Sequence, residues 1–299
     1  MKSKIVLLFL LLSSIVLCQE KTIFIKDSLT QEPVVFATVQ FGGKIGGIYA
    51  DENGKAIIPD NVKEIFISQI AYEKKTLDMR NISNNEVVVL SPTSSMLPEV
   101  VVSAIPLKRQ EVGILKKKGS NGLIATPNTN FALFIPYDNT WRTQPYILSI
   151  ISFFNDIKGS DEFPSEKCNI RFDLRLPDEE GAPGDISIIG EQLVHYSEKK
   201  YSGKETVNLI KPVQFPQEGI FVVIDFITPN NPNPNLLISP SIDVTSSGGM
   251  AQTWSKTITS DSSWKKMDEK DSAWSATIKD FFGKGATKMN LRAGLQIAY

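Results

Sequence analysis

The sequence predicts an all-β protein built from two sandwiches, and three observations support this fold class. Short apolar runs recur between Thr22 and Leu90 with turn-forming residues between them, and no helical period interrupts them. Turn signals at such short intervals favour an antiparallel sandwich. Further along, apolar and polar residues alternate over 170–176, which is typical of a half-buried strand. At 299 residues, the chain is long enough for two domains.

Residues 1–19 have the composition of a secretory signal peptide. Lys2 and Lys4 precede the apolar run 5–12, and this run is too short for a membrane span. Cleavage is expected near Cys18 and Gln19, which predicts an exported protein of the periplasm, the outer-membrane surface or the extracellular space. Lipid attachment at Cys18 is the alternative, although Leu17 stands where a small residue is expected before an acylated cysteine.

The first sandwich is predicted over residues 20–92 and contains about seven strands. Strands are expected at 22–25, 34–41, 64–72, 75–79 and 86–90, with shorter pieces on both sides of Asp51-Glu52-Asn53-Gly54. These four residues favour a tight turn with a left-handed position at Gly54. We expect this turn to close a β-hairpin.

The order of motifs in this region resembles a known domain family. Pro33-Val34-Val35-Phe36-Ala37-Thr38-Val39 is followed by Ala50 to Gly54, by Ile67-Ser68-Gln69-Ile70-Ala71-Tyr72 and by Leu97-Pro98-Glu99-Val100-Val101-Val102. This order is similar to the carboxypeptidase-regulatory-like domain of Bacteroidetes, which has a transthyretin-like sandwich fold. The family usually has Gly-Tyr where this chain has Ala71-Tyr72. The resemblance implies a module that accompanies a zinc peptidase domain or precedes an outer-membrane receptor.

Neither of these continuations fits the rest of the chain. His195 is the only histidine, whereas a peptidase zinc site needs a set of His and Glu ligands. A receptor barrel of about 22 strands needs more residues than remain after Val102. We therefore expect no metal, no cofactor and no catalytic domain, so that the protein is not an enzyme.

A linker is predicted over residues 93–122, and a second β-sandwich or jelly-roll-like domain over 123–299. The linker is basic at Lys108, Arg109 and Lys116-Lys117-Lys118 and carries glycines that should interrupt regular structure. Its charges are either solvated or available to anionic lipid or glycan. In the second domain, strands are expected at 131–136, 146–154, 170–176 and 220–227, and the whole resembles a sandwich module of flavobacterial secreted proteins.

The last nine residues alternate between apolar and polar side chains and end on Tyr299. Outer-membrane barrels often end in this way, but the prolines of the second half argue against a barrel. We interpret this segment as the terminal core strand of the sandwich.

Three tryptophans, Trp254, Trp264 and Trp274, recur at a spacing of ten residues. Aromatic rings on a sheet face can stack on sugar rings, so these residues are the candidate ligand-binding site. An even spacing places them on one side only within an unbroken strand, and polar segments such as 261–263 should break it. Core packing is the alternative for each ring.

Other reactive residue types lie in unpromising contexts. Once the signal is removed, Cys168 is the only cysteine, and its position before an alternating run favours a small buried residue at a strand start. Acidic residues gather in two loops, which favours solvation over a hydrolase carboxylate pair. These residues are Asp156, Asp161, Glu162, Asp178, Glu179 and Glu180. His195 stands alone beside apolar residues and is interpreted as structural.

The net charge of −1 gives no basic face for a nucleic-acid partner. The sequence therefore favours a non-catalytic, exported cell-envelope protein with a binding or assembly role, whose partner is an envelope protein or a surface glycan. Membrane association without a spanning segment is compatible with this role. An accessory component of a TonB-dependent outer-membrane transport or secretion system is the alternative, and a carboxylate-pair hydrolase comes third.

Overall fold

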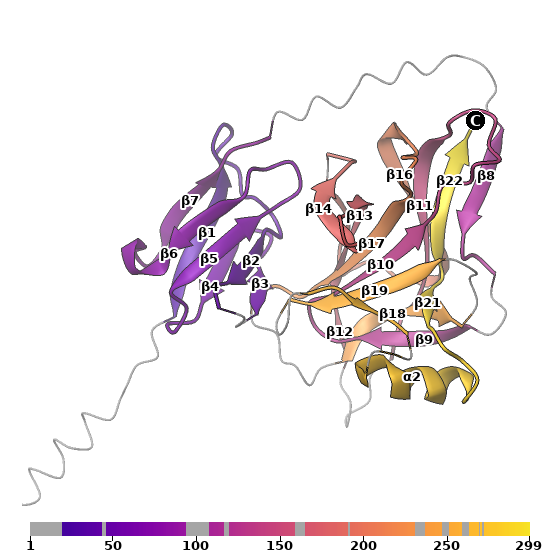
Figure 1. The fold of residues 1–299 in the computed structure, drawn as a ribbon. Helices are drawn as coiled ribbons and strands as arrows, with labels where there is room; N and C mark the ends of the chain where they lie inside the picture. The colour runs from indigo at the N-terminus through magenta and orange to yellow at the C-terminus, as the bar shows by residue number, and fades with distance from the viewer. Residues whose placement is uncertain are drawn as a thin grey trace, which may run out of the picture.

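The computed structural model describes two β-sandwiches and one α-helix (Figure 1). The described residues are 20–43, 46–93, 108–116, 120–158, 165–190, 192–230, 237–246, 251–258, 263–268, 270 and 272–299. The all-β fold class is confirmed. The signal segment 1–19 and the Glu-Val-Val-Val segment 99–102 lie outside the described residues. None of the helices in these ranges has the length and apolar character needed to cross a bilayer.

The N-terminal sandwich has seven strands in two sheets. One sheet has the order β4-β1-β7, formed by Lys55–Ile58, Lys21–Asp27 and Glu86–Leu90. The other has the order β3-β2-β5-β6, formed by Gly47–Tyr49, Thr38–Phe41, Glu64–Ser68 and Lys75–Asp78. A short 3-10 helix, η1 (Met79–Asn81), follows β6. β1 pairs in parallel with β7, so the first and last strands of this domain lie side by side.

The turn at Asp51 to Gly54 is confirmed, but the hairpin expected around it is wrong. Asp51 Oδ1 accepts hydrogen bonds from the backbone N–H of Asn53 at 2.8 Å and of Lys55 at 2.9 Å, and Gly54 has φ +69°. The flanking strands β3 and β4 belong to different sheets. The turn therefore carries the chain from one sheet to the other, because each flanking strand finds its partners elsewhere in the sandwich.

The C-terminal sandwich packs two larger sheets around one core. The first sheet runs β14-β13-β17-β10-β19-β20, with β15 beside β13. Its strands are Pro183–Ser187, Asn169–Pro177, Ile220–Ile227, Thr129–Ile135, Gln252–Thr257 and Lys265–Lys266, and β15 is Leu193–His195. We call this sheet the front sheet, since its outer face lies toward the N-terminal sandwich (Figure 1).

The second sheet runs β12-β18-β11-β22-β8, with β16 beside β11 and with β9 and β21 beside β18. Its strands are Ser165–Lys167, Leu237–Thr245, Tyr146–Asn155, Ala293–Ala298, Arg109–Gly113, Ser202–Gln214, Ser120–Ala125 and Asn290–Leu291. The terminal strand β22 lies between β11 and β8, with Leu295 and Ile297 fully buried. The prediction of a terminal core strand is confirmed.

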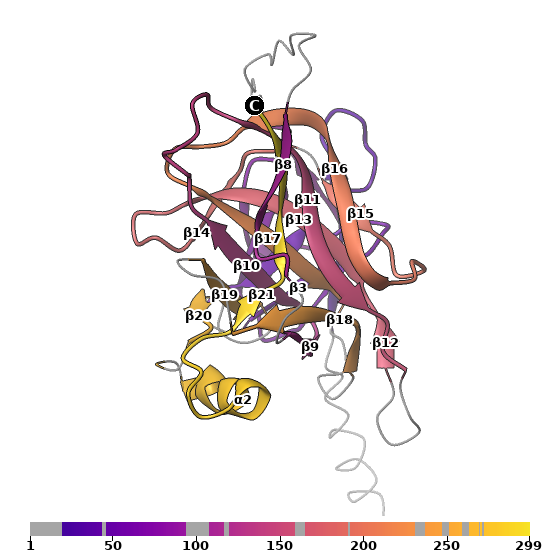
Figure 2. The same cartoon turned by 90° about the vertical axis from the view of Figure 1, so that its right-hand side faces the viewer.

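The linker was misplaced and a helix was missed in the prediction from the sequence. The expected linker contributes strands β8 and β9 to the second sheet, so that this sheet takes up the chain from Arg109 onward. Segment 272–282, for which no helix was predicted, forms helix α2 (Ser272–Phe282) at one end of the sandwich (Figure 2). Its residue Ile278 is fully buried in the core between the sheets, which explains why the helix forms there.

Candidate functional site

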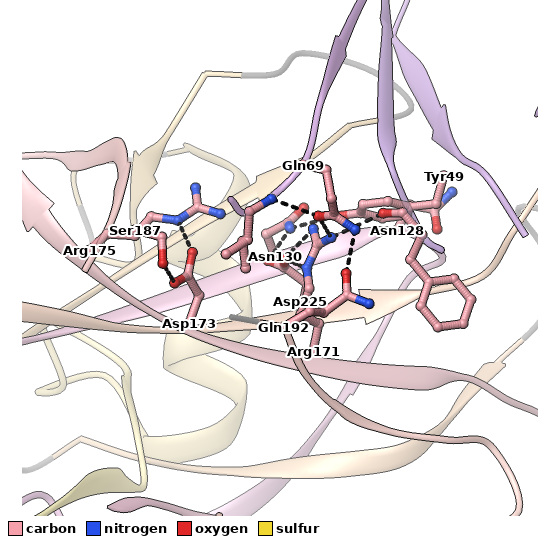
Figure 3. A network of polar contacts seen from close by, with 12 residues as sticks. Tyr49, Gln69, Asn128, Asn130, Arg171, Asp173, Arg175, Ser187, Gln192 and Asp225 are labelled. Carbon is pink, nitrogen blue, oxygen red and sulfur yellow. Dashed lines mark hydrogen bonds and ion pairs between the residues drawn. The ribbon is translucent and has the colours of Figure 1, made fainter. Parts of the chain in front are cut away.

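A buried ion pair lies at the centre of the contact between the two sandwiches (Figure 3). Arg171 of β13 stands directly opposite Asp225 of β17, and its Nη2 lies 2.8 Å from Asp225 Oδ2. The two side chains are 3% and 1% exposed. The amide of Asn130, on the adjacent strand β10, donates a hydrogen bond to the other carboxylate oxygen. Three neighbouring strands thus place one charged row on the outer face of the front sheet.

The N-terminal sandwich covers this row with polar partners. Arg171 Nη1 donates to the backbone oxygen of Phe36 at 3.0 Å and to Gln69 Oε1 at 2.9 Å. The Tyr49 hydroxyl accepts a hydrogen bond from Asn130 Nδ2 at 2.8 Å. Because a buried charge is costly unless its hydrogen bonds are made, these contacts from the N-terminal sandwich stabilise the charge of Arg171.

Apolar contacts surround the ion pair. Phe36 and Tyr49 are buried against Ile227 and Ile258 of the C-terminal sandwich. The contact therefore combines a desolvated ion pair with an apolar core, which is typical of a permanent domain interface rather than a transient one.

The charges at this interface are fixed near neutral pH. Burial opposes ionisation of Asp225, yet the charges of Arg171 and Arg175 lower the pKa of its carboxyl below the usual value. Burial raises the pKa of the Tyr49 hydroxyl well above its usual value. With Asp225 ionised and Tyr49 neutral, the network serves as a structural clamp and offers no group that exchanges a proton near pH 7.

A second ion pair lies further along the same outer face. Arg175 Nε is 2.6 Å from Asp173 Oδ2, and the hydroxyl of Ser187 donates to Asp173 Oδ1 at 2.6 Å. Asp173 is fully buried. The alternating residues of β13 were interpreted as one buried and one solvated side, but Arg171 and Asp173 are buried as well. On the side that was expected to face water, Arg171 contacts Phe36 and Gln69 of the N-terminal sandwich. Asp173 contacts Arg175 and Ser187 of its own sheet.

The structure brings two of the three candidate tryptophans together. Trp254 on β19 and Trp264 just before β20 are partly buried on the outer face of the front sheet. Both rings pack against an apolar cluster formed by Ala132, Phe221 and Val223. The outer face thus changes across the sheet, from the charged residues of β13 to the aromatic residues of β19 and of the segment before β20.

Trp274 lies apart from this pair. It belongs to α2, packs against the core between the two sheets, and donates a hydrogen bond from Nε1 to Ser255 Oγ at 3.0 Å. Ser255 alternates with Trp254 along β19 and points to the opposite face of the sheet. The core-packing alternative therefore describes Trp274, and the candidate ligand-binding face keeps only Trp254 and Trp264.

Cys168 and His195 have the structural environments that were predicted from the sequence. Cys168 is buried, and burial raises the pKa of its thiol far above the usual value. His195 packs edge-on against Phe172 with ring centroids 5.0 Å apart, and burial lowers the pKa of its imidazole.

The acidic loops show structural rather than catalytic contacts where they are described. Asp178 accepts two backbone hydrogen bonds within its own turn, from Glu180 and Ala182. Asp156 forms a 3.8 Å ion pair with Lys167. Asp161 and Glu162 lie outside the described residues.

A hollow of about 320 Å³ lies at the edge of the domain interface. The turn Asp51-Glu52-Asn53 lines one side, and β12 and its neighbours line the other with Glu166, Lys167 and Asn169. Within the described ranges, no group of three or more His, Cys, Asp or Glu side chains is arranged to hold a metal ion.

The residues of the clamp were not identified as a site from the sequence. The signal for Asp225 was its isolation within the otherwise apolar run 220–227, where a charged residue needs a buried partner. No comparable signal identified Tyr49 or Gln69, because their partners Asn130 and Gln192 lie 81 and 123 residues away in the chain. Comparison of the chain with protein-family models, curated proteins and solved structures finds no match.

Proposed function

We propose that this protein is a non-catalytic, exported binding protein of the cell envelope and that it binds a glycan on the outer face of the front sheet. The observation that supports this function is the pairing of Trp254 and Trp264 on one partly exposed sheet face. The two indole rings pack on Ala132, Phe221 and Val223 and form an apolar platform on this face. Such a platform suits the axial C–H groups of sugar rings without requiring a deep pocket.

The buried clamp supports a binding role for the whole chain. Because Arg171 and Asn130 form hydrogen bonds with Phe36, Gln69 and Tyr49, a ligand on the front sheet is held at a set position relative to the N-terminal sandwich. The resemblance of that sandwich to the carboxypeptidase-regulatory-like domain suggests a mounting module for envelope proteins. The expected secretory signal supports export.

The experiment is a glycan array probed with the chain from residue 20 to residue 299. We expect binding that Trp254→Ala and Trp264→Ala each reduce at least tenfold. Trp274→Phe is the control, since it keeps an aromatic ring against the core and leaves the outer face of the front sheet unchanged. Circular dichroism checks that every variant is folded. The absence of binding across the array would contradict the proposal, as would equal losses in all three variants.

The alternative is an accessory role in a TonB-dependent outer-membrane transport or secretion system. It rests on the resemblance of the N-terminal sandwich to modules that precede outer-membrane receptors. Co-purification of an outer-membrane receptor with the tagged full-length chain, unaffected by Trp254→Ala, would favour this role over glycan binding.

A further inference from the structure

We propose that the glycan bound on the front sheet is acidic, and that Lys256 and Lys266 bind its carboxylate or sulfate groups while Trp254 and Trp264 stack on its sugar rings. This inference rests on the proposed glycan-binding function and specifies the ligand class of the same face.

The first observation is the interleaving of the two lysines with the two tryptophans. Lys266 pairs with Trp254 across β19 and β20, and its ammonium lies 4.9 Å from the centroid of the Trp254 ring. The ammonium of Lys256 lies 4.7 Å from the centroid of the Trp264 ring. Each ring therefore has a cation over one face, so a sugar stacked on the opposite face of the ring lies close to a positive charge.

The second observation is the charge balance of this end of the sheet. The two arginines of the outer face, Arg171 and Arg175, are each paired with a buried aspartate of the same face. In contrast, within the described residues no carboxylate forms a salt bridge with Lys256 or Lys266. These two lysines, beside the tryptophans, are thus cations without a direct carboxylate partner among the described residues, which complements an anionic ligand.

The environment of Lys256 strengthens this argument. Burial, together with the positive charge of Arg175, lowers the pKa of its ammonium to about 8. Arg171 also opposes the charge of Lys256, while Asp225 and Asp185 favour it. A bound anion would add to the favourable charge of Asp225 and Asp185 at this partly buried ammonium.

The geometry of the strand provides a matched control residue. Lys265 is exposed and adjoins Lys266 on β20, but successive side chains of a strand point to opposite faces. Replacing Lys265 removes the same charge from the same strand without changing the tryptophan face.

The test measures binding of the chain 20–299 to polygalacturonate and to the same polymer after reduction of its carboxyl groups, by isothermal titration calorimetry. We expect at least tenfold tighter binding of the acidic polymer. Lys256→Met with Lys266→Met should remove this preference, whereas Lys265→Met should change the affinity less than twofold. Lys256→Arg keeps the charge and should keep the preference for the acidic polymer. This variant separates the loss of charge from a loss of binding caused by misfolding.

The pH dependence gives a second readout. Affinity for polygalacturonate should fall as the pH rises from 7 to 9, because Lys256 loses its charge in this range, and the fall should be absent in Lys256→Met. Equal binding of the acidic and reduced polymers would overturn the acidic class but leave glycan binding intact. No binding of either polymer, together with a silent glycan array, would overturn both proposals.

Two further outcomes would overturn the inference. Retention of polygalacturonate binding in Trp254→Ala with Trp264→Ala would show simple charge attraction without sugar stacking. Equally tight binding of single-stranded DNA would show a general polyanion surface rather than a site for an acidic glycan.

Discussion

The guanidinium of Arg171 lies over the ring of Tyr49, 5.3 Å from the ring centroid, and thereby joins a strand of the C-terminal sandwich to a strand of the N-terminal one. Both residues of this pair are buried, and Asp225 balances the charge of Arg171. The two sandwiches therefore share one charged, hydrogen-bonded contact, and the stability of the whole chain should depend on it.

Removal of the positive charge from this contact should destabilise the protein strongly. Arg171→Met leaves Asp225 buried without its ion-pair partner, which typically costs about 3–5 kcal/mol of the free energy of unfolding. Urea denaturation of the chain 20–299 measures this loss. Lys74→Met is the control, because Lys74 and Asp185 form an exposed ion pair between the same two sandwiches, worth less than about 1 kcal/mol. Equal losses in the two variants would contradict the clamp.

Adding Asp225→Leu to Arg171→Met should restore part of the lost stability. The second change removes the unpaired carboxylate, and buried ion pairs can often be replaced by apolar residues at little cost. A double variant less stable than Arg171→Met by urea denaturation would argue against an ion pair as the source of the loss.

The contribution of Asp225 to the free energy of unfolding should decrease as the pH falls. Its folded-state pKa lies below the unfolded value of about 3.9, so its stabilisation is present above about pH 4 and is lost as the pH falls through the folded pKa. We expect the difference in unfolding free energy between the native chain and Asp225→Asn to be constant from pH 5 to pH 7. Denaturant titrations should then show it shrink below pH 4, and a difference that grows on acidification would contradict this assignment.

Gly54 should tolerate no side chain. A Cβ at this position would lie 2.3 Å from the backbone oxygen of Ile25, in addition to the strain of φ +69°. Gly54→Ala should cost about 3 kcal/mol or more, measured by thermal or urea unfolding. Gly43→Ala is the matched control, since Gly43 also has positive φ but no atom within 4 Å of its Cβ position, and should cost about 1 kcal/mol.

Cys168 should be unreactive in the folded protein. Its thiol is 2% exposed, and burial keeps its pKa far above the usual range, so the thiolate is scarce at pH 8. Maleimide labelling of the chain 20–299 should proceed only after denaturation. Leu29→Cys, at a position that is 80% exposed, should label at once and shows that the reagent is active. Rapid labelling of folded Cys168 would mean that this part of the core opens.

The clearest parts of the fold could be predicted from local patterns. Alternation over 170–176 predicted β13 because period-two burial needs no knowledge of the partner strand. The turn at Asp51 was recognisable because its hydrogen bonds lie within five residues. Helix α2 and strand β8 were missed, since Ile278 and the edge of β22 stabilise them from distant parts of the chain.

The sequence by itself determined the all-β class, the core side of the main strands and the turn at Gly54, because neighbouring residues encode these features. Only the tertiary structure decided that β3 and β4 join different sheets, and that Trp254 and Trp264 share a face while Trp274 does not. It also decided that Arg171 and Asp225 are buried between the sandwiches. These features depend on contacts between residues far apart in the chain, and burial and charge pairing at such contacts have no local signature.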